Sequence, residues 1–316
     1  MSFMRVILGG NGVMAKARNK RFKKVKGNLY AIKGDKDSRT VLITGASGGL
    51  GASFADVFAK NGFNIVLTAR RKDKLKEQAD KIEKKYGVRT TLISVDLADP
   101  TGPQHIFDEC ERMGIEVDAL INNAGLAIPG FYQETEWKKH SDFLQLMITA
   151  PSQLSYLFEP GMVKRNYGRI INVSSFVGTI TPTGSYTLYG AAKSYLIKFS
   201  QAHAEELKGT GVKVMALCPG FFKSELHDET DESQITSQLP ARMFLDVDNV
   251  AEEGYDKIMN SDEVVYINGR IYQLMGNMER SNFSKIRGKG QLRSYADRIR
   301  TNLGSDGRNK QSGTNG

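Results

Sequence analysis

The sequence has few cysteines, no long apolar run and no clustered metal ligands, and each absence excludes a class of protein. Two cysteines, Cys110 and Cys218, cannot form a disulfide framework, which favours a reducing, cytoplasmic location. No apolar run approaches the ~20 residues of a membrane-spanning helix, and Val6–Leu8 is too short for a secretory signal. The four histidines lack metal-ligand spacing, so we expect no metal site.

Acidic residues are scarce at the two ends of the chain. Residues 1–39 carry a net charge of +9 and residues 276–316 a net charge of +6. The whole chain has a net charge of +9, so residues 40–275 are mildly acidic at −6. Binding to an anionic membrane surface or an acidic partner would therefore use these two basic arms. The arms lack interleaved aromatics and any nucleic-acid motif, so solvated tails are the simpler interpretation.

Apolar strands alternate with helical patterns between these arms. The pattern predicts strands at 41–43, 64–68, 89–95, 119–121, 169–173, 212–217 and 270–274, and helices at 50–60, 72–85, 104–113, 137–163, 191–207 and 247–259. Pro151 or Pro160 should kink the long fourth helix. We expect a basic N-terminal extension over 1–39, an α/β domain over 40–275, and a basic, partly disordered tail over 276–316. The domain should contain a doubly wound parallel sheet of six or seven strands with helices on both faces.

A glycine-rich loop follows the first predicted strand and opens the first helix. In this position the glycines allow a tight turn, close approach of a pyrophosphate, and packing of helix on strand. The candidate cofactor contacts in the loop are Gly45, Ser47, Gly49, Leu50 and Gly51. A rival pattern at residues 10–15 is followed by lysines and arginines rather than by a βαβ unit, which argues against a second nucleotide site.

The end of the second strand indicates which dinucleotide binds. An acidic residue there would accept the ribose 2′-hydroxyl of NAD, but this sequence has Arg70 and Arg71. A guanidinium can hold a 2′-phosphate through two hydrogen bonds, and Ser47 can donate a third. We therefore expect NADP(H) to be favoured over NAD(H). The alternative is that both arginines merely begin a solvated basic helix.

Tyr189 and Lys193 lie four residues apart and so share one face of a predicted helix. The lysine ammonium should lower the pKa of the phenol, which lets Tyr189 act as general acid and base on a carbonyl and alcohol pair. Ser175 follows another predicted strand, at the sheet edge where ligands bind, and should position the carbonyl.

These segments together resemble the short-chain dehydrogenase/reductase family. The resemblance covers about residues 39–275 and comprises six motifs in order: TGASGGLG at 44–51, DL at 96–97, NNAG at 122–125, NVSS at 172–175, YGAAK at 189–193 and CPGFFKS at 218–224. It implies a Rossmann fold, NAD(P)(H)-dependent chemistry between carbonyl and alcohol, and a homodimer or homotetramer.

The resemblance also implies further cofactor contacts. Asp96 and Leu97 should flank the adenine, and Lys193 should also hold the nicotinamide ribose. The strand end contributes Asn123, Ala124 and Gly125. The segment that meets the carboxamide contributes Pro219, Gly220, Phe222 and Ser224, the last in place of the threonine that is frequent there.

Two departures from the family pattern bear on activity. Counting back from Pro160 places Met147 where members often carry an asparagine that extends a proton relay from the lysine, although a shift of two residues would place Gln145 or Thr149 there. The segment from Ser175 to Tyr189 is one residue longer than usual, which makes Ser174 an alternative to Ser175.

The predicted function is NADPH-dependent reduction of a ketone or aldehyde, reversible as alcohol oxidation. Fatty 3-oxoacyl groups, steroids and xenobiotic carbonyls all remain open as substrates. Apolar residues in the expected lid, residues 221–244, favour a hydrophobic or acyl substrate but also suit lid packing. The alternative is a cofactor-binding regulatory protein with weak or no catalysis, because of Met147. A third class would act through the basic arms on a membrane surface or nucleic acid.

Overall fold

The computed structural model describes residues 23–25, 28–30, 38–128, 131–180, 187–222, 240 and 243–280. The strands of its large sheet are β3 (Thr40–Thr44), β4 (Asn64–Ala69), β5 (Thr90–Ser94), β6 (Ala119–Asn122), β7 (Gly168–Val173), β8 (Val212–Cys218) and β9 (Val265–Ile267). The helices are α1 (Gly49–Lys60), α2 (Lys72–Tyr86), α3 (Gly102–Arg112), α4 (Trp137–Leu144), α5 (Ala150–Lys164), α6 (Thr187–Glu206), α9 (Val247–Asn260) and α10 (Arg270–Arg280).

The large sheet has seven strands in the order β5-β4-β3-β6-β7-β8-β9, and every neighbouring pair is parallel. This confirms the predicted doubly wound sheet and is the strand order of the Rossmann fold. The chain reverses its direction of travel across the sheet between β3 and β6. Loops that leave the carboxyl ends of these two strands diverge there, and the crevice between them is the usual ligand site of such sheets.

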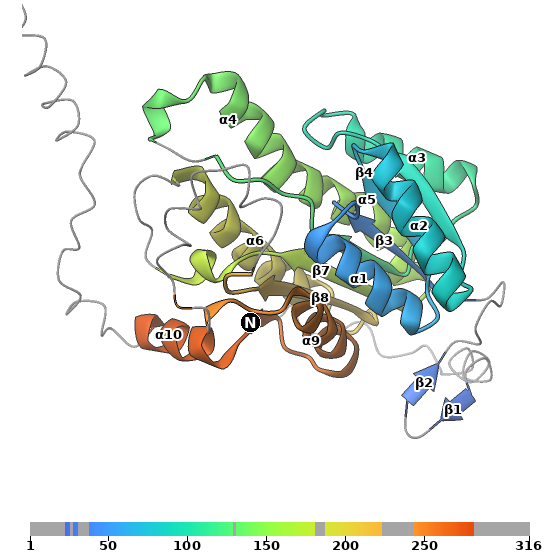
Figure 1. The fold of residues 1–316 in the computed structure, drawn as a ribbon. Helices are drawn as coiled ribbons and strands as arrows, with labels where there is room; N and C mark the ends of the chain where they lie inside the picture. Colours follow the sequence, from blue (N-terminus) through green and yellow to red (C-terminus); the bar gives the residue numbers. More distant parts are fainter. Residues whose placement is uncertain are drawn as a thin grey trace, which may run out of the picture.

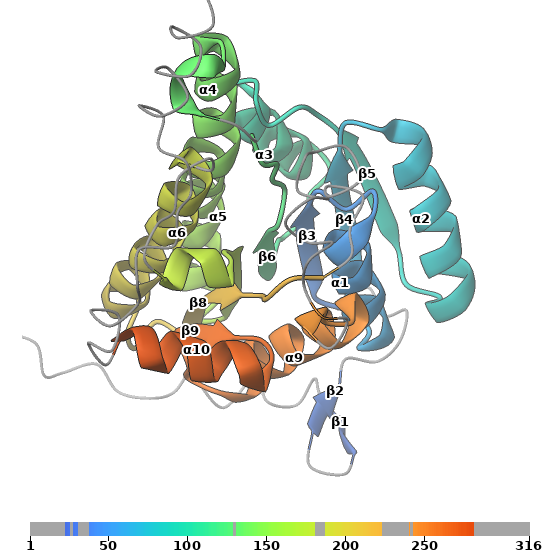
Figure 2. The same cartoon turned by 60° about the vertical axis from the view of Figure 1, so that its left-hand side comes forward.

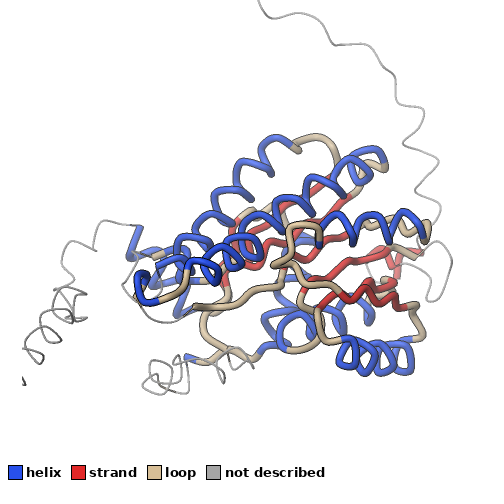
Figure 3. The backbone as a smooth tube through the Cα atoms, turned by 90° about the horizontal axis from the view of Figure 1, so that it is seen from above, coloured by secondary structure: helices blue, strands red, loops and turns tan. Residues whose placement is uncertain are grey.

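The central strands are buried on both faces, which explains their continuous apolar runs. Val41, Ile43 and Ile121 pack on one face with α1, α2 and α9, whereas Leu42 and Leu120 pack on the other with α3 and α5. Figure 3 shows the strands enclosed between the two helical layers. Figure 1 shows α1, α2 and α9 together along one side of the sheet.

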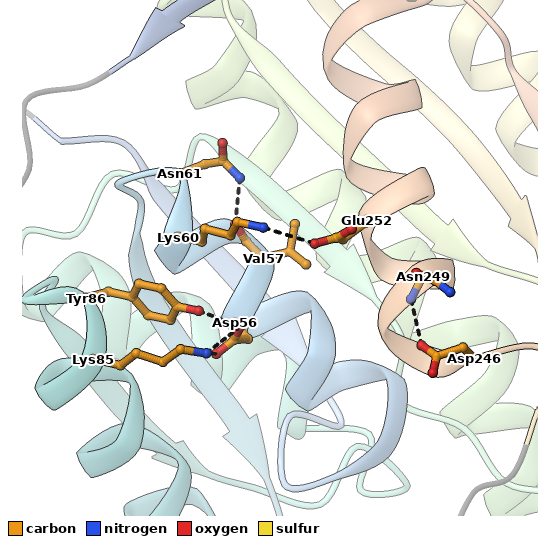
Figure 4. A network of polar contacts seen from close by, with 9 residues as sticks. All are labelled: Asp56, Val57, Lys60, Asn61, Lys85, Tyr86, Asp246, Asn249 and Glu252. Atoms are coloured by element: carbon orange, nitrogen blue, oxygen red, sulfur yellow. Dashed lines mark hydrogen bonds and ion pairs between the residues drawn. The ribbon is translucent and has the colours of Figure 1, made fainter.

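Polar contacts join the helices of the first layer around α1 (Figure 4). Lys60 Nζ lies 3.1 Å from Glu252 on α9, and the Tyr86 hydroxyl of α2 donates to Asp56 at 2.6 Å. Asp246 caps α9 because its carboxylate accepts the backbone amide of Asn249 at 3.0 Å. The lysine pair is exposed at both ends, so apolar packing beneath contributes most of the stability here.

The last predicted strand is wrong. Residues 270–274 begin α10, and the seventh strand is β9, five residues earlier. Gly269 has a positive φ of 85°, so the chain turns sharply before the helix starts. In α10, Tyr272 is buried while Ile271 and Leu274 are exposed, which is a helical rather than an alternating pattern. Helix α10 crosses the domain boundary expected at residue 275.

The long fourth helix is continuous from α4 to α5, but its irregularity is not at either proline. A π-helical turn, η3 (Gln145–Thr149), joins the two α-helical parts. Pro151 directly follows this turn, so its missing amide hydrogen falls where the regular hydrogen-bond pattern is already interrupted, and Pro160 lies inside α5. Single π-helical turns inside α-helices occur mostly at functional sites, and this one is centred on Met147.

Only short pieces of the expected extensions lie among the described residues. Strands β1 (Lys23–Val25) and β2 (Asn28–Tyr30) form an antiparallel hairpin in the basic N-terminal segment (Figure 2). The rival glycine pattern at 10–15 and nearly all of the tail after α10 are outside the described residues. Among the residues that the structure describes, we find no helix of the length and apolarity needed to cross a membrane.

Candidate active site

The glycine loop between β3 and α1 forms a backbone cradle. Gly45 has a φ of 68°, and a Cβ there would lie 2.9 Å from the Cα of Ala124. A Cβ at Gly51 would lie 2.3 Å from the carbonyl oxygen of Gly45. Only glycine fits both positions, because a side chain at either would push apart the loop, the helix and the end of β6. Gly48 caps α1 without a side chain, so the helix N-terminus can face an anion directly.

The end of β6 is tied to this cradle through Thr44. The Thr44 hydroxyl accepts the backbone amides of Asn123 and Ala124, each at 2.9 Å. In return, Asn123 Nδ2 donates to the carbonyl oxygen of Thr44 at 2.9 Å. These bonds fix the predicted contacts Asn123–Gly125 against the glycine loop. Thr44 is the last residue of β3 and the first residue of the TGASGGLG motif, and neither position predicts its contact with the end of β6.

The two arginines that follow β4, Arg70 and Arg71, contact different partners. Arg71 Nη2 donates to Ser47 Oγ in the glycine loop at 3.2 Å. Arg70 Nη1 lies 3.9 Å from Asp96 Oδ2, in an exposed pair. Both guanidiniums therefore border the edge where the adenosine end of a dinucleotide would lie in the predicted orientation. Leu97, next to Asp96, is buried and belongs to the apolar core under this edge.

Tyr189 and Lys193 lie one turn apart on α6, as predicted, and Lys193 Nζ lies 5.5 Å from the centre of the Tyr189 ring. The lysine side chain is 5% exposed, and its Nζ donates to the carbonyl oxygen of Val173 at 2.8 Å. Burial lowers the pKa of Lys193 from 10.5 to about 8, because desolvation disfavours the ammonium form. At neutral pH the Lys193 side chain is therefore still charged in most molecules, and this charge lies beside the phenol of Tyr189.

The two candidate serines differ in what they contact. The Ser174 hydroxyl is buried and donates to the backbone carbonyl of Lys193 at 2.7 Å, so it anchors α6 to the sheet. Ser175 is only partly buried, and its Oγ accepts the backbone amide of Val177 at 3.2 Å. That contact fixes the Ser175 oxygen and leaves its hydroxyl hydrogen to donate. The geometry therefore favours Ser175 over Ser174 as the residue that faces a ligand.

Met147 is buried and packs against α6, which carries Tyr189 and Lys193. It is 2% exposed and lies in a cluster with Phe143, Ala192 and Tyr189. A Cβ on Gly125 would lie 3.1 Å from Met147 Sδ, so the thioether abuts the predicted cofactor segment. Of the alternatives named above, Thr149 is exposed and Gln145 is partly buried, which leaves Met147 as the residue that contacts both sides of the site.

A small cavity of about 10 Å³ adjoins Met147. Its lining includes the side chains of Thr44, Asn122 and Leu196. The Asn122 Oδ1 atom is buried and has no hydrogen-bond partner. A polar cavity of roughly 10–15 Å³ can hold one water molecule, so an internal water is the physical partner we expect for this oxygen.

A chain of buried amides behind the site was missed by the sequence analysis. Asn122 Nδ2 donates to Asn172 Oδ1 at 2.8 Å, and Asn172 Nδ2 donates to Ser200 Oγ at 2.9 Å. This chain links β6, β7 and α6. Strand β6 ends at the first residue of the NNAG segment, Ser175 follows β7, and α6 carries Tyr189. Asn122 and Asn172 belong to motifs named in the sequence. No sequence pattern marks Ser200 as part of this chain, because its partner Asn172 is 28 residues away.

The segment after β8 is only partly within the described residues. The Pro219 carbonyl accepts the Phe176 amide at 2.8 Å, and a Cβ on Gly220 would lie 2.1 Å from the Tyr272 ring. Phe222 forms an isolated bridge with Leu245. Ser224 and most of the expected lid fall outside the described residues.

The cradle, the helix N-terminus and the guanidiniums suit a dinucleotide phosphate. Two positions admit no Cβ, the helix offers backbone amides, and Arg70 and Arg71 supply positive charge at the far edge. The described residues hold no cluster of three or more side chains suited to a metal ion. The site can therefore bind an anionic cofactor and present a phenol, an ammonium and a hydroxyl to a substrate beside it.

Comparison with known proteins gives consistent matches. The family model for short chain dehydrogenases matches residues 39–235. A very-long-chain 3-oxoacyl-CoA reductase of Coprinopsis cinerea is 34% identical over 195 residues, which is 61% of this chain and 57% of that protein. This chain thus matches little more than half the length of that relative. A 3-oxoacyl-acyl-carrier-protein reductase of Escherichia coli is 28% identical over 245 residues, which is 77% of this chain and 98% of that protein.

Solved structures show the same architecture. A short-chain dehydrogenase from Sphingobium yanoikuyae in complex with NADPH is 29% identical, with a TM-score of 0.67 over 81% of this chain and 99% of that chain. L-sorbose reductase from Gluconobacter frateurii, complexed with NADPH and L-sorbose, is 26% identical, with a TM-score of 0.64 over 75% and 97% of the two chains.

Proposed function

This chain belongs to the short-chain dehydrogenase family, and we propose that it reduces a ketone or aldehyde with NADPH. The observation that carries the proposal is the placement of Tyr189 and Lys193 on one face of α6, with Met147 between Tyr189 and the predicted cofactor segment at Gly125. The 3-oxoacyl reductases among its relatives support a carbonyl substrate. Apolar surroundings of Tyr189, including Met147 and Phe143, support a hydrophobic one.

In this proposal the cofactor, when bound, supplies the hydride, and the chain positions and protonates the substrate. Ser175 donates its hydroxyl hydrogen to the carbonyl oxygen. Tyr189 gives its phenolic proton to the same oxygen as negative charge develops there. The Lys193 ammonium lies beside the phenol and stabilises the phenolate that remains. In the reverse direction the phenolate accepts the proton of the alcohol.

The arginines at the end of β4 support NADPH rather than NADH as the cofactor. No carboxylate from β4 is available to accept a ribose 2′-hydroxyl, and Asp96 on the neighbouring loop already faces Arg70. Arg71 and Ser47 are in contact, so a 2′-phosphate can bind both at once. Two solved relatives that contain NADPH support this preference.

A second function is favoured by one observation, the buried thioether of Met147. A methionine can neither donate nor usefully accept the hydrogen bond that a water beside Lys193 would need. A protein that binds the cofactor with weak or no turnover is therefore the alternative. We further propose homo-oligomerisation, a cytoplasmic location, and contact of the basic arms with anionic surfaces, all as expectations from the sequence.

The test combines binding and turnover on the full chain. NADPH fluorescence on titration reports binding, and loss of NADPH absorbance over a panel of 3-oxoacyl thioesters, steroid ketones and simple aryl ketones reports reduction. The reductase predicts both signals. Binding without reduction of any carbonyl selects the regulatory alternative, and absence of binding refutes both.

A further inference from the structure

His140, on α4, is a buried histidine that the proposed chemistry does not use. Its side chain is 5% exposed, and its ring stacks on Tyr132 of the short helix η2 (Tyr132–Glu134), with ring centres 4.6 Å apart and planes inclined by 22°. Its Nε2 lies 2.8 Å from the backbone carbonyl oxygen of Tyr132. Its Nδ1 is buried and has no hydrogen-bond partner among the residues that the structure describes.

These contacts fix the protonation of the ring. A carbonyl oxygen can only accept, so Nε2 must carry the hydrogen that bonds to Tyr132. In the neutral imidazole the other nitrogen, Nδ1, is then an acceptor. A buried acceptor without a partner is unfavourable, so His140 requires a hydrogen-bond donor that the described side chains do not provide.

A small cavity beside His140 offers the place for that donor. Its volume is about 10 Å³, and its lining combines apolar and hydroxyl-bearing side chains: Ile128, Phe131, Tyr132, Thr135, His140, Thr187 and Leu188. This space accommodates a single oxygen atom with its hydrogen, which is a water molecule or one hydroxyl group. An amide with its substituents is too large.

The cavity is lined by the two residues that precede the proposed reacting group, Tyr189. Thr187 and Leu188 immediately precede Tyr189, and two residues of chain span at most ~7 Å. Ile128 and Leu188 also belong to the apolar cluster that packs against Tyr189 and Met147. An apolar substrate skeleton that starts at Tyr189 and follows these side chains would therefore end at His140.

We propose that His140 is a specificity-determining residue that accepts a hydrogen bond from a hydroxyl group of the substrate. The inferred substrate is an apolar ketone or aldehyde that carries a hydroxyl several carbons from the reacting carbonyl. Nδ1 accepts the hydroxyl hydrogen, and Thr135 and Thr187 lie beside it. This proposal rests on the reductase function proposed above and specifies its substrate class.

The test uses pairs of ketones that differ only by a hydroxyl in place of a methyl group. One series is linear with the hydroxyl at the far end and varied chain length, and a second pair is a keto steroid with and without a ring hydroxyl. The variant His140→Phe keeps the size and stacking of the ring but removes the Nδ1 acceptor, and with it the Nε2 donor to the Tyr132 carbonyl. His105→Phe, on the exposed side of α3, is the matched control.

In the wild-type chain we expect kcat/KM for the best hydroxylated ketone to exceed that of its methyl partner by about 10-fold or more. The preference for the hydroxylated ketone should disappear in His140→Phe and persist in His105→Phe. A wild-type chain without any such preference, or a preference that survives in His140→Phe, overturns the proposal and assigns the cavity to an internal water.

A second measurement does not depend on turnover or on the variant's folding. The ¹⁵N spectrum of the imidazoles in the wild-type chain, which has four histidines, should show Nδ1 of His140 shift when the hydroxylated ketone is added with NADPH. The methyl partner should leave it unchanged. If the shift occurs but no ketone is reduced, the reductase proposal fails and the subsite stands. Reduction with neither shift nor preference refutes the subsite alone.

Discussion

Replacing Lys193 by methionine tests whether the buried ammonium is as costly as its surroundings indicate. Burial lowers its pKa from 10.5 to about 8, and each pKa unit corresponds to 1.36 kcal/mol. The charged lysine therefore costs the cofactor-free chain roughly 3 kcal/mol at neutral pH. Lys193→Met removes this cost and also removes the hydrogen bond to the Val173 carbonyl, which opposes the gain by ~1–3 kcal/mol.

The pH dependence isolates the electrostatic part. The unfolded chain keeps the lysine proton up to about pH 10.5, whereas the folded chain loses it from about pH 8. Between these values the unfolded state binds more protons, so the stability that Lys193 contributes rises with pH. The cost of burying the ammonium is fully present below the folded pKa of about 8 and disappears above 10.5. From pH 7 to pH 9 the wild type should gain roughly 1.4 kcal/mol relative to the methionine variant.

Thermal melts of both proteins at several pH values, without NADPH, measure this difference. For a domain of this size we expect the gap in Tm to change by roughly 3–6 °C between pH 7 and pH 9. The comparison of variant with wild type cancels the other groups that titrate in this range. A gap that does not change with pH would show that Lys193 is solvated in the folded chain, and would refute the reasoning from its burial. The variant should also lose reductase activity at every pH.

Other predictions concern the remaining parts of the site. Arg70→Asp should weaken NADPH binding by about 10- to 100-fold in fluorescence titrations and NADH binding far less, since it removes a charge-assisted contact. Lys84→Asp, at the other end of α2, is the control. Equal losses for both cofactors would exclude Arg70 from the 2′-phosphate site. Tyr189→Phe should leave the NADPH Kd within about twofold and lower turnover by about 100-fold or more, unless another acid serves. Met147→Asn should raise turnover or lower the solvent isotope effect on turnover. Its Tm should fall, because a buried amide without partners costs ~1–3 kcal/mol. Lower turnover with an intact fold and intact NADPH affinity would contradict a missing relay.

The sheet was predictable because its strands are buried on both faces and read as continuous apolar runs. Val41–Ile43 and Ile65–Leu67 are fully buried, and no helical spacing competes with them. The last strand was misplaced because residues 270–274 and β9 are both short and rich in Ile, Tyr and Leu or Val. Only the positive φ at Gly269 and the tertiary burial of Tyr272 decide between helix and strand there. Neither is visible in local periodicity.

The site was predictable where its chemistry depends on residues close in sequence. The glycines of the cradle act within one loop, and Tyr189 and Lys193 act within one helical turn. Contacts between distant segments were not predictable. The Thr44 hydroxyl meets backbone amides 79 and 80 residues away, and no local pattern selects a threonine for that purpose. The same holds for His140, whose importance lies in one unpartnered nitrogen rather than in a motif.

Met147 shows how the two kinds of information combine. The sequence singled it out only by a count from Pro160, which left Gln145 and Thr149 open. The structure adds a physical criterion, because the π-helical turn centres on Met147 and turns its thioether toward Gly125 and α6. The neighbouring cavity and the unpartnered Asn122 oxygen show that a polar partner is still required at this point. Since methionine cannot provide it, we expect a water held by Asn122 to place a hydrogen-bonding group between β6 and α6.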